Sequence, residues 1–486
     1  MFVQSAEFIA AHRDDHAAQG HGEDSIYVYG QEKTLETVKL SKMNLAVNGL
    51  HGSVMQANTY IEDPHGSLGQ FDFVMANPPF NVDDVAVAAV EKDPRFNTYG
   101  LPRNKTKLKK AEVGLETIPN ANYLWINLFA TSLKDKGRAA LVMANSASDA
   151  RHSEADIRRA LIEANLIYGM LTMPSNMFYS VTLPATLWFF DKGKTDERIL
   201  FIDTRNIFTQ IDRVHREFSD EQVANIAIIS QLHKGRRERF TALVDHYFAQ
   251  GIASLRAHQT SIEALCAQLF EALEDKAARK TVTDLKRQWT GLATLEERYA
   301  GYLTFLRHLD TSAKTDCAGH NTAQHKLLTA FTPFFSALHT DLKALDKTLR
   351  QHEKQLADAA LAEGKRGTDR TTKVLKTALE ALHTDVKESE VWFTHIQWLQ
   401  ERFPKAQYED VTGLCKLASR AEVAEQDWSL NPGRYVGVVI EEDGKTEEEF
   451  IGGLLDMNAE LTRLNVEARA LEDVIAGNVL LLAGEE

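Results

Sequence analysis

The feature that most constrains the fold is an alternation of short apolar runs with helical stretches over residues 1–205. The runs have the length and the β-branched and aromatic content of strands; they are 25–32, 53–57, 71–76, 138–144, 166–173, 185–190 and 199–203. Helical patterns lie between them at 36–49, 122–135 and 153–165. Strands that alternate with amphipathic helices predict an α/β fold whose mostly parallel sheet is covered on both faces.

The last three runs depart from this alternation. No full helix separates 166–173 from 185–190, or 185–190 from 199–203. A parallel pair needs a long crossover, usually a helix. We therefore expect an antiparallel strand to close that edge of the sheet.

The character of the chain changes at about residue 206, where strand signals give way to helical periodicity. Glycines in the stretch 363–370 predict the turn of a long helical hairpin, and an aromatic helix over 391–403 stops at Pro404. We predict a helical region over 206–408 and a C-terminal segment over 409–486, with loop and strand at 427–440.

Apolar residues spaced alternately by three and four positions follow in that segment. They form the seam Leu454, Met457, Leu461, Leu464, Ala468, Leu471 and Ile475. This spacing is typical of a coiled coil or a tight helical bundle. The stripe packs either on the helical region of the same chain or against another subunit, and periodicity does not decide between them.

Net charge limits how the chain can bind nucleic acid. The formal charge is −14, so contact with phosphates must be local or supplied by a partner. The stretch 103–110 is basic and contains Arg103, Lys105 and Lys107. It is either a solvated loop or a local DNA contact.

Composition also bears on compartment and metals. The three cysteines are far apart and form no CxxC, which fits a reducing compartment and argues against a zinc site. No stretch has the roughly 20 apolar residues of a membrane span, and no secretory signal is visible. We expect a cytoplasmic protein without a membrane partner. Histidines at 12, 16 and 21 are expected to be solvated, so we predict no metal site.

The sequence Asn77-Pro78-Pro79-Phe80 directly follows the apolar run 71–76. An amine attached to a heteroaromatic ring is a poor nucleophile, because its lone pair is delocalised into the ring. The Asn77 side-chain carbonyl and the Pro78 backbone carbonyl could accept hydrogen bonds from both N–H groups and draw the lone pair back. The prolines stiffen the loop, and Phe80 could stack on a base that has left its duplex.

Glu32 ends the first apolar run. An acidic residue at the carboxyl end of a strand in such a fold commonly binds ribose hydroxyls. A solvated loop carboxylate is as common, so Glu32 gains weight only beside the Asn77–Phe80 motif.

Several motifs occur in an order that resembles S-adenosylmethionine-dependent amino-methyltransferases: IYVYGQE, KMNLAVNG, FDFVMANPPFN, GRAALVMAN, MPSNMFYSVTLPATLWFF and, near the end, DWSLNPGRYVG. The combination looks like the modification (M) subunit of type I restriction–modification systems. The resemblance covers 1 to about 230 and 405–486. It implies a Rossmann-like methyltransferase sheet in 1–205 and methylation of N6 of adenine in double-stranded DNA. It further implies a complex with a specificity subunit, a restriction subunit and a second M subunit, in which modification and restriction both require this subunit.

The resemblance also assigns residue roles. It makes Asn77, Pro78, Pro79 and Phe80 the catalytic loop and Glu32 the ribose-binding acid. Asn58 stands where the family often has an Asp near the cofactor's adenine. Phe178 matches the segment that packs against the flipped base, although a core aromatic before a strand is the equally weighted alternative.

One departure from the family is large. The family carries a glycine-rich loop after its first strand, reading roughly Asp-Pro-Ala-Cys-Gly-Ser-Gly-Gly, and this chain begins with what resembles the residues after that loop. We therefore expect an N-terminally truncated form whose sheet lacks its first strand. Two half-sheets would then expose unpaired edges, and cofactor binding would be poor. A non-catalytic scaffold remains an alternative, as does a protein glutamine N5-methyltransferase, since a glutamine amide poses the same lone-pair problem.

Overall fold

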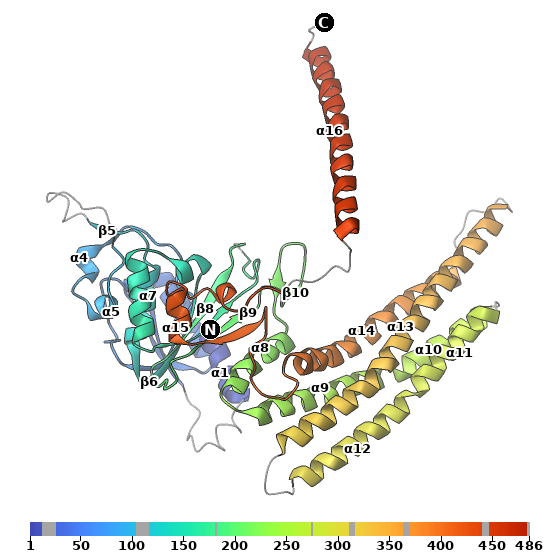
Figure 1. Cartoon of the computed structure of the whole chain (residues 1–486), viewed down its shortest axis with the longest axis horizontal. Helices are drawn as coiled ribbons and strands as arrows, with labels where there is room; N and C mark the ends of the chain where they lie inside the picture. The colour runs from blue at the N-terminus through green and yellow to red at the C-terminus, as the bar shows by residue number, and fades with distance from the viewer. Residues whose placement is uncertain are drawn as a thin grey trace. The chain divides into compact units, whose positions relative to one another are not determined.

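The computed structural model describes residues 1–11, 26–103, 116–179, 182–273, 276–310, 316–362, 370–439 and 447–483. The chain divides into two compact units, Met1–Gly437 and Val438–Glu486. Figure 1 shows the strands gathered in one part of the first unit and long helices in the rest of it.

The first unit contains a two-stranded parallel sheet, formed by β1 (Tyr27–Glu32) and β2 (His51–Gln56). Helix α3 (Leu35–Val47) connects these strands and packs on them through Val38 and Leu45. The connection is the strand–helix–strand unit that the sequence predicted.

A second, six-stranded sheet has the order β12-β9-β7-β8-β6-β3. Its strands are β3 (Phe71–Ala76), β6 (Leu133–Ala144), β7 (Ile167–Thr172), β8 (Ala185–Asp191), β9 (Ile199–Asp203) and β12 (Cys415–Ala418). Strands β3 and β6 are parallel, as are β7 and β9, whereas β8 runs antiparallel to both of its neighbours.

An antiparallel strand closes the edge beside β9, as expected, but none of the three predicted runs is that strand. β8 lies inside the sheet, where Trp188 and Phe190 are buried, and it is too apolar to be an edge strand. The edge beside β9 is closed by β12, which comes from the C-terminal segment.

Both faces of the larger sheet are covered, as predicted. Met170 and Phe201 belong to a core that includes the helices α6 (Asn122–Ser132) and α7 (Ser153–Glu163). Leu171 and Leu200, the adjacent residues on the same strands, belong to a second core that includes α8 (Asp220–His233). This alternation follows from the two-residue repeat of a strand.

The two sheets are separate, which matches the expectation of two half-sheets with unpaired edges. β3 ends the larger sheet, and β1 pairs only with β2 among the described strands. The Tyr29 and Phe71 rings lie 5.4 Å apart, so side chains of the two sheets touch. Phe73 on β3 is 73% exposed.

Long helices make up the rest of the first unit. They are α8, α9 (Arg237–Ala257), α10 (Gln259–Ala272), α11 (Lys276–Thr290), α12 (Leu292–Asp310), α13 (Cys317–Ala362) and α14 (Arg370–Arg402). Helix α14 packs against α9 and α13, and α13 also packs against α11 (Figure 1). α14 ends two residues before Pro404, close to the predicted stop, and Phe393, Ile396 and Leu399 are buried in the core. The predicted hairpin turn, 363–370, lies almost wholly outside the described residues.

Short elements complete the first unit. They are α1 (Phe2–Ala11), β4 (Val85–Ala86), α4 (Val87–Val90), α5 (Pro94–Asn97), β5 (Thr117–Ile118), η2 (Asn145–Asp149), β10 (Thr209–Gln210), β11 (Arg216–Glu217), α15 (Arg420–Glu425) and η3 (Pro432–Arg434). The strand expected within 427–440 is absent from the described part of that stretch, where Asn431–Val436 form turns around η3 instead. Its Tyr435 stacks on Phe201 at 3.9 Å between ring centroids.

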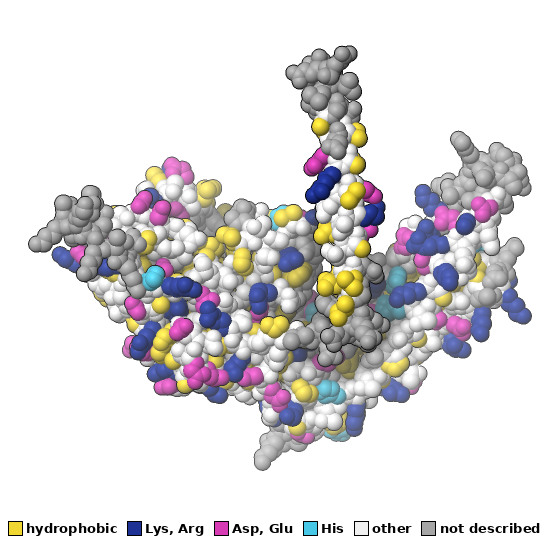
Figure 2. Space-filling model, turned by 45° about the horizontal axis from the view of Figure 1, so that its top comes forward, with side chains coloured by type: hydrophobic (Ala, Val, Ile, Leu, Met, Phe, Trp, Pro, Cys, Tyr) yellow, Lys and Arg dark blue, Asp and Glu magenta, His cyan; other side chains and the backbone are white. Residues whose placement is uncertain are grey.

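The second unit contains α16 (Glu447–Ala483), which carries the predicted seam. The large seam side chains, from Leu454 to Ile475, are between 47% and 65% exposed. Hydrophobic side chains are spread along this helix in Figure 2. No described helix of either unit is long and apolar enough to cross a bilayer.

Candidate active site

The Asn77–Phe80 loop lies at the carboxyl end of β3, at the open edge of the larger sheet. Asn77 is exposed, Pro78 is buried and Phe80 is half-buried. Within the described part of the chain, the Asn77 side-chain amide makes no hydrogen bond. Its oxygen is therefore available to accept one from a ligand.

Three asparagines hold the end of this loop. Asn81 has a positive φ of 54°, which the loop needs in order to turn away from the strand. Its backbone N–H donates to Asn122 Oδ1 at 2.8 Å, and its Oδ1 accepts from Asn122 Nδ2 and Asn120 Nδ2, both at 3.0 Å. Asn122 is buried at the start of α6. These residues were not predicted as part of the site; their signal in the sequence is the alternation of Asn120 and Asn122 before a helix.

Phe178 lies in the loop that follows β7 and faces Phe80. The two ring centroids are 6.5 Å apart, with the rings nearly perpendicular at 80°. Both rings are half-buried, so each keeps exposed surface. The structure thus brings together two aromatic residues that are about a hundred positions apart in the sequence.

Glu32 and Asn58 lie at the carboxyl ends of neighbouring parallel strands. Glu32 pairs in register with Gln56, which places Asn58 two residues beyond the end of β2. One Glu32 oxygen accepts from the Thr34 backbone N–H at 3.2 Å. The Asn58 side-chain oxygen accepts from the Tyr60 backbone N–H at 3.2 Å, so it is partly committed to its own turn.

These residues fit the nucleoside half of S-adenosylmethionine. The half-exposed Glu32 carboxylate has a second oxygen that can accept hydrogen bonds from a ribose diol. Asn58 retains an amide N–H₂ that can donate to an acceptor on an adenine edge.

The basic stretch is only partly described. Arg103 is exposed and lies between two carboxylates, 3.4 Å from Glu91 and 3.8 Å from Glu116. These pairs offset much of its charge. Lys105 and Lys107 lie outside the described residues.

No group of three His, Cys, Asp or Glu side chains in the described ranges could hold a metal ion. The histidines at 12, 16 and 21 fall in the gap between residues 11 and 26.

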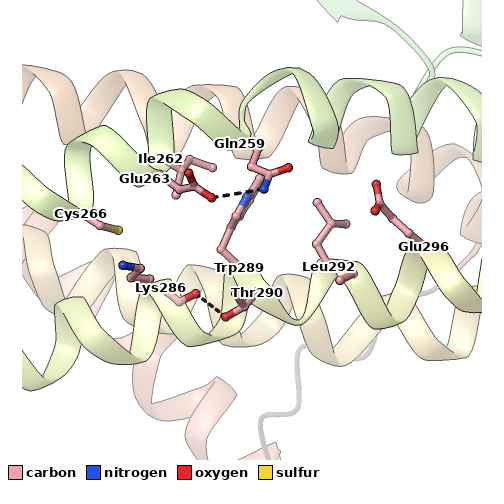
Figure 3. Close-up of a pocket in the computed structure, with 10 residues that line it drawn as sticks. Gln259, Ile262, Glu263, Cys266, Lys286, Trp289, Thr290, Leu292 and Glu296 are labelled. Atoms are coloured by element: carbon pink, nitrogen blue, oxygen red, sulfur yellow. Dashed lines mark hydrogen bonds between the residues drawn. The ribbon is translucent and has the colours of Figure 1, made fainter.

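A cavity of about 120 Å³ lies in the helical region, remote in sequence from the Asn77–Phe80 loop. It is enclosed by α10, α11 and α12, with Trp289 and Cys266 in its wall (Figure 3). In the same view the Gln259 side-chain amide donates a hydrogen bond to the Glu263 carboxylate, so these two side chains are paired within the wall. None of the residues that line it belongs to the candidate active site.

A profile of the N-6 DNA Methylase family matches residues 1–247, which is half of the chain and includes all of the candidate site. The chain belongs to this family.

Two curated relatives carry related names. The chain is 35% identical over 206 residues to the "Type I restriction enzyme MjaIX methylase subunit" of Methanocaldococcus jannaschii, a match that covers 42% of this chain and 35% of the relative. It is 34% identical over 230 residues to the "Type I restriction enzyme HindI methylase subunit" of Haemophilus influenzae. This match covers 46% of this chain and 47% of the relative. The chain thus spans about half or less of these relatives.

Among solved structures, the chain is similar to the type I restriction–modification methyltransferase subunit from Streptococcus thermophilus. The identity is 25%, the TM-score is 0.37, and the match covers 43% of this chain and 42% of that one.

Proposed function

We propose that the chain transfers a methyl group from S-adenosylmethionine to N6 of adenine in double-stranded DNA, as the modification subunit of a type I restriction–modification complex. The observation that carries this proposal is the Asn77–Phe80 loop. In a chain of the N-6 DNA methylase family, it presents an exposed, unpaired amide beside the facing rings of Phe80 and Phe178.

The proposed chemistry begins with the target amine. The Asn77 Oδ1 and the Pro78 backbone carbonyl accept its two N–H groups, which favours a tetrahedral nitrogen with a localised lone pair. Phe80 stacks on the flipped adenine, and Phe178 contacts that ring from the side. S-adenosylmethionine, when bound, supplies an electrophilic methyl group. As the new N–C bond forms, the bond between that methyl group and the cofactor sulfur would break with its electron pair left on sulfur, and the nitrogen would give up one proton to solvent.

The residues proposed to bind the cofactor lie at the carboxyl ends of β1 and β2. Glu32 holds the ribose hydroxyls, and Asn58 donates to the adenine edge of the cofactor. Arg103, Lys105 and Lys107 are proposed as contacts with the DNA backbone, where Arg103 would first have to leave Glu91 and Glu116.

The proposed partners are a specificity subunit, a restriction subunit and a second copy of this subunit. The exposed seam of α16 supports them, because an apolar stripe of heptad spacing needs a second helix to cover it. The net charge of −14 fits an enzyme whose sequence readout is supplied by another subunit.

The test is methyl transfer by the full chain, with and without a specificity subunit, to double-stranded DNA and to a protein with an accessible glutamine. N6-methyladenine is measured by mass spectrometry of digested DNA. We expect Asn77→Ala to lose roughly 100-fold or more in rate, which is the size of the loss when one preorganised hydrogen-bonding group of an oxyanion hole is removed. Asn48→Ala is the matched control, because within the described part of the chain the Asn48 side chain bonds only Asn44, at the exposed end of α3.

Calorimetry with S-adenosylmethionine separates the alternatives. Binding together with N6-methyladenine supports the proposal. Methylation of glutamine but not of DNA would favour the protein methyltransferase, and neither binding nor transfer would favour the non-catalytic scaffold.

A further inference from the structure

Tyr179, directly after Phe178, is 93% exposed. A tyrosine ring normally buries most of its area, whereas this ring lies almost fully in solvent directly after a residue of the candidate active site. The residue takes no part in the chemistry proposed above.

A small hairpin lies beside this ring. Strands β10 and β11 pair through Thr209–Glu217 and Gln210–Arg216. The Arg216 backbone N–H donates to the Asn176 carbonyl at 2.9 Å, and the Arg216 guanidinium lies 3.9 Å from the Phe208 ring centroid. These contacts tie the hairpin to the loop that carries Phe178 and Tyr179.

The hairpin tip is ordered by Asp212. Its carboxylate accepts from the backbone N–H groups of Val214 and His215, at 2.7 and 2.8 Å, and from His215 Nδ1 at 2.6 Å. The His215 ring centroid is 5.4 Å from that of Tyr179. His215 thus supports the Tyr179 ring, which otherwise projects into solvent.

The tip combines apolar and positive side chains. Ile211 and Val214 are each about half exposed. The hairpin carries Arg213 and Arg216 beside the carboxylates of Asp212 and Glu217, whereas the nearby Arg205 pairs with Asp203 at 2.6 Å. The hydrogen bond that His215 Nδ1 donates to the Asp212 carboxylate also raises the pKa of His215 above its ordinary value. A solvent-facing aromatic ring with arginines nearby is the chemistry that binds single-stranded or opened nucleic acid, because any base has a π-face on which such a ring can stack.

We propose that Tyr179 and the tip residues Ile211–His215 form a second DNA contact, in which Tyr179 stacks on the unpaired base exposed when the target adenine leaves the duplex. This inference rests on the proposed function and adds a positioning residue to it. Tyr179 stabilises the opened duplex while Phe80 and Phe178 hold the flipped adenine.

The experiment measures binding of the full chain to fluorescein-labelled duplex DNA with a short central bubble that contains adenine, by fluorescence anisotropy over a range of salt concentrations. Tyr179→Ala should weaken binding roughly tenfold, the loss expected for one aromatic–base stack, while Tyr179→Phe should bind as the wild type does. The salt dependence should be unchanged, because tyrosine carries no charge. Arg213→Ala should instead reduce the salt slope by about one.

Phe305→Ala on α12 is the matched control, since it removes a partly exposed aromatic ring outside the site. Circular dichroism of each variant checks that it folds. Unchanged binding by Tyr179→Ala, or equal loss in Tyr179→Phe, would overturn the inference. A wild-type chain that binds no DNA, alone or with a specificity subunit, would instead overturn the proposed function.

Discussion

The candidate active site depends on a residue outside its motif. From the start of α6, Asn122 bonds the backbone N–H and the side-chain oxygen of Asn81 and so fixes the turn that ends the Asn77–Phe80 loop. The sequence predicted the loop from its prolines and from the strand before it. It did not reveal Asn122, because which amides pair across some forty residues depends on where α6 packs.

Asn122→Ala is expected to lower the free energy of unfolding by about 1–3 kcal/mol, because the backbone N–H of Asn81 loses its partner. Methylation should slow roughly tenfold, while the KM for S-adenosylmethionine stays constant, since a misplaced loop harms orientation. Urea denaturation and steady-state kinetics measure these effects. Asn120→Ala, which removes a more exposed amide, should do less; an unchanged kcat in Asn122→Ala would contradict the positioning role.

At the scale of elements, the strands were predictable and their order in the sheet was only partly so. The bounds of β3 and β9 match the predicted runs. The interior position of β8 and the use of β12 as an edge strand were not foreseen. Apolar runs reveal that a strand is buried, but hydrogen-bond partners depend on how the chain crosses the sheet.

The helix α15 should make the chain sensitive to acid. Its capping box places Glu422 against the Ser419 backbone N–H at 2.8 Å and Lys416 Nζ at 2.9 Å. The hydrogen bond from Lys416, followed by those from Ser419, lowers the pKa of Glu422 from 4.5 to about 2. The carboxylate therefore stabilises the fold above about pH 4.5, and this contribution is lost as the pH falls toward 2. As the pH falls over this range, the melting temperature of Glu422→Gln should decrease less steeply than that of the wild type. Melting temperatures that decrease equally with pH in both proteins would contradict the prediction.

The seam of α16 should decide partner binding. Leu461→Asp or Leu464→Asp is expected to abolish co-purification with a specificity subunit, because a charge in an apolar seam is costly to bury. The first unit should keep its melting temperature. Val466→Asp is the control, because Val466 is equally exposed but lies off the seam. Intact complexes with both seam variants would refute the bundle.

At the scale of the whole molecule, the C-terminal segment belongs partly to the first unit. Tyr435 stacks on Phe201 of β9, Trp428 accepts a hydrogen bond from Arg158 of α7 at 2.6 Å, and Ser429 bonds Asp149. Together with β12, these contacts join residues more than two hundred positions apart. The unit therefore ends at Gly437, after this segment.

Two variants test this division. Tyr435→Ala should destabilise the first unit by about 3–5 kcal/mol, the usual cost of removing a large buried aromatic ring. Deletion of Val438–Glu486 should leave the melting temperature of that unit unchanged. Differential scanning calorimetry measures both. A deletion that unfolds the unit as Tyr435→Ala does would show that the two units depend on each other.

The sequence by itself determined the α/β character of the first 205 residues, the helices that follow, the α16 seam and the Asn77–Phe80 loop. These follow from periodicity and from proline geometry, which act over a few residues. Only the tertiary structure decided that Phe178 faces Phe80, that Asn122 holds the loop and that β12 closes the sheet. It also showed Tyr179 in solvent beside the β10–β11 hairpin. Such features depend on which distant surfaces pack together, and that depends on the burial of the whole core.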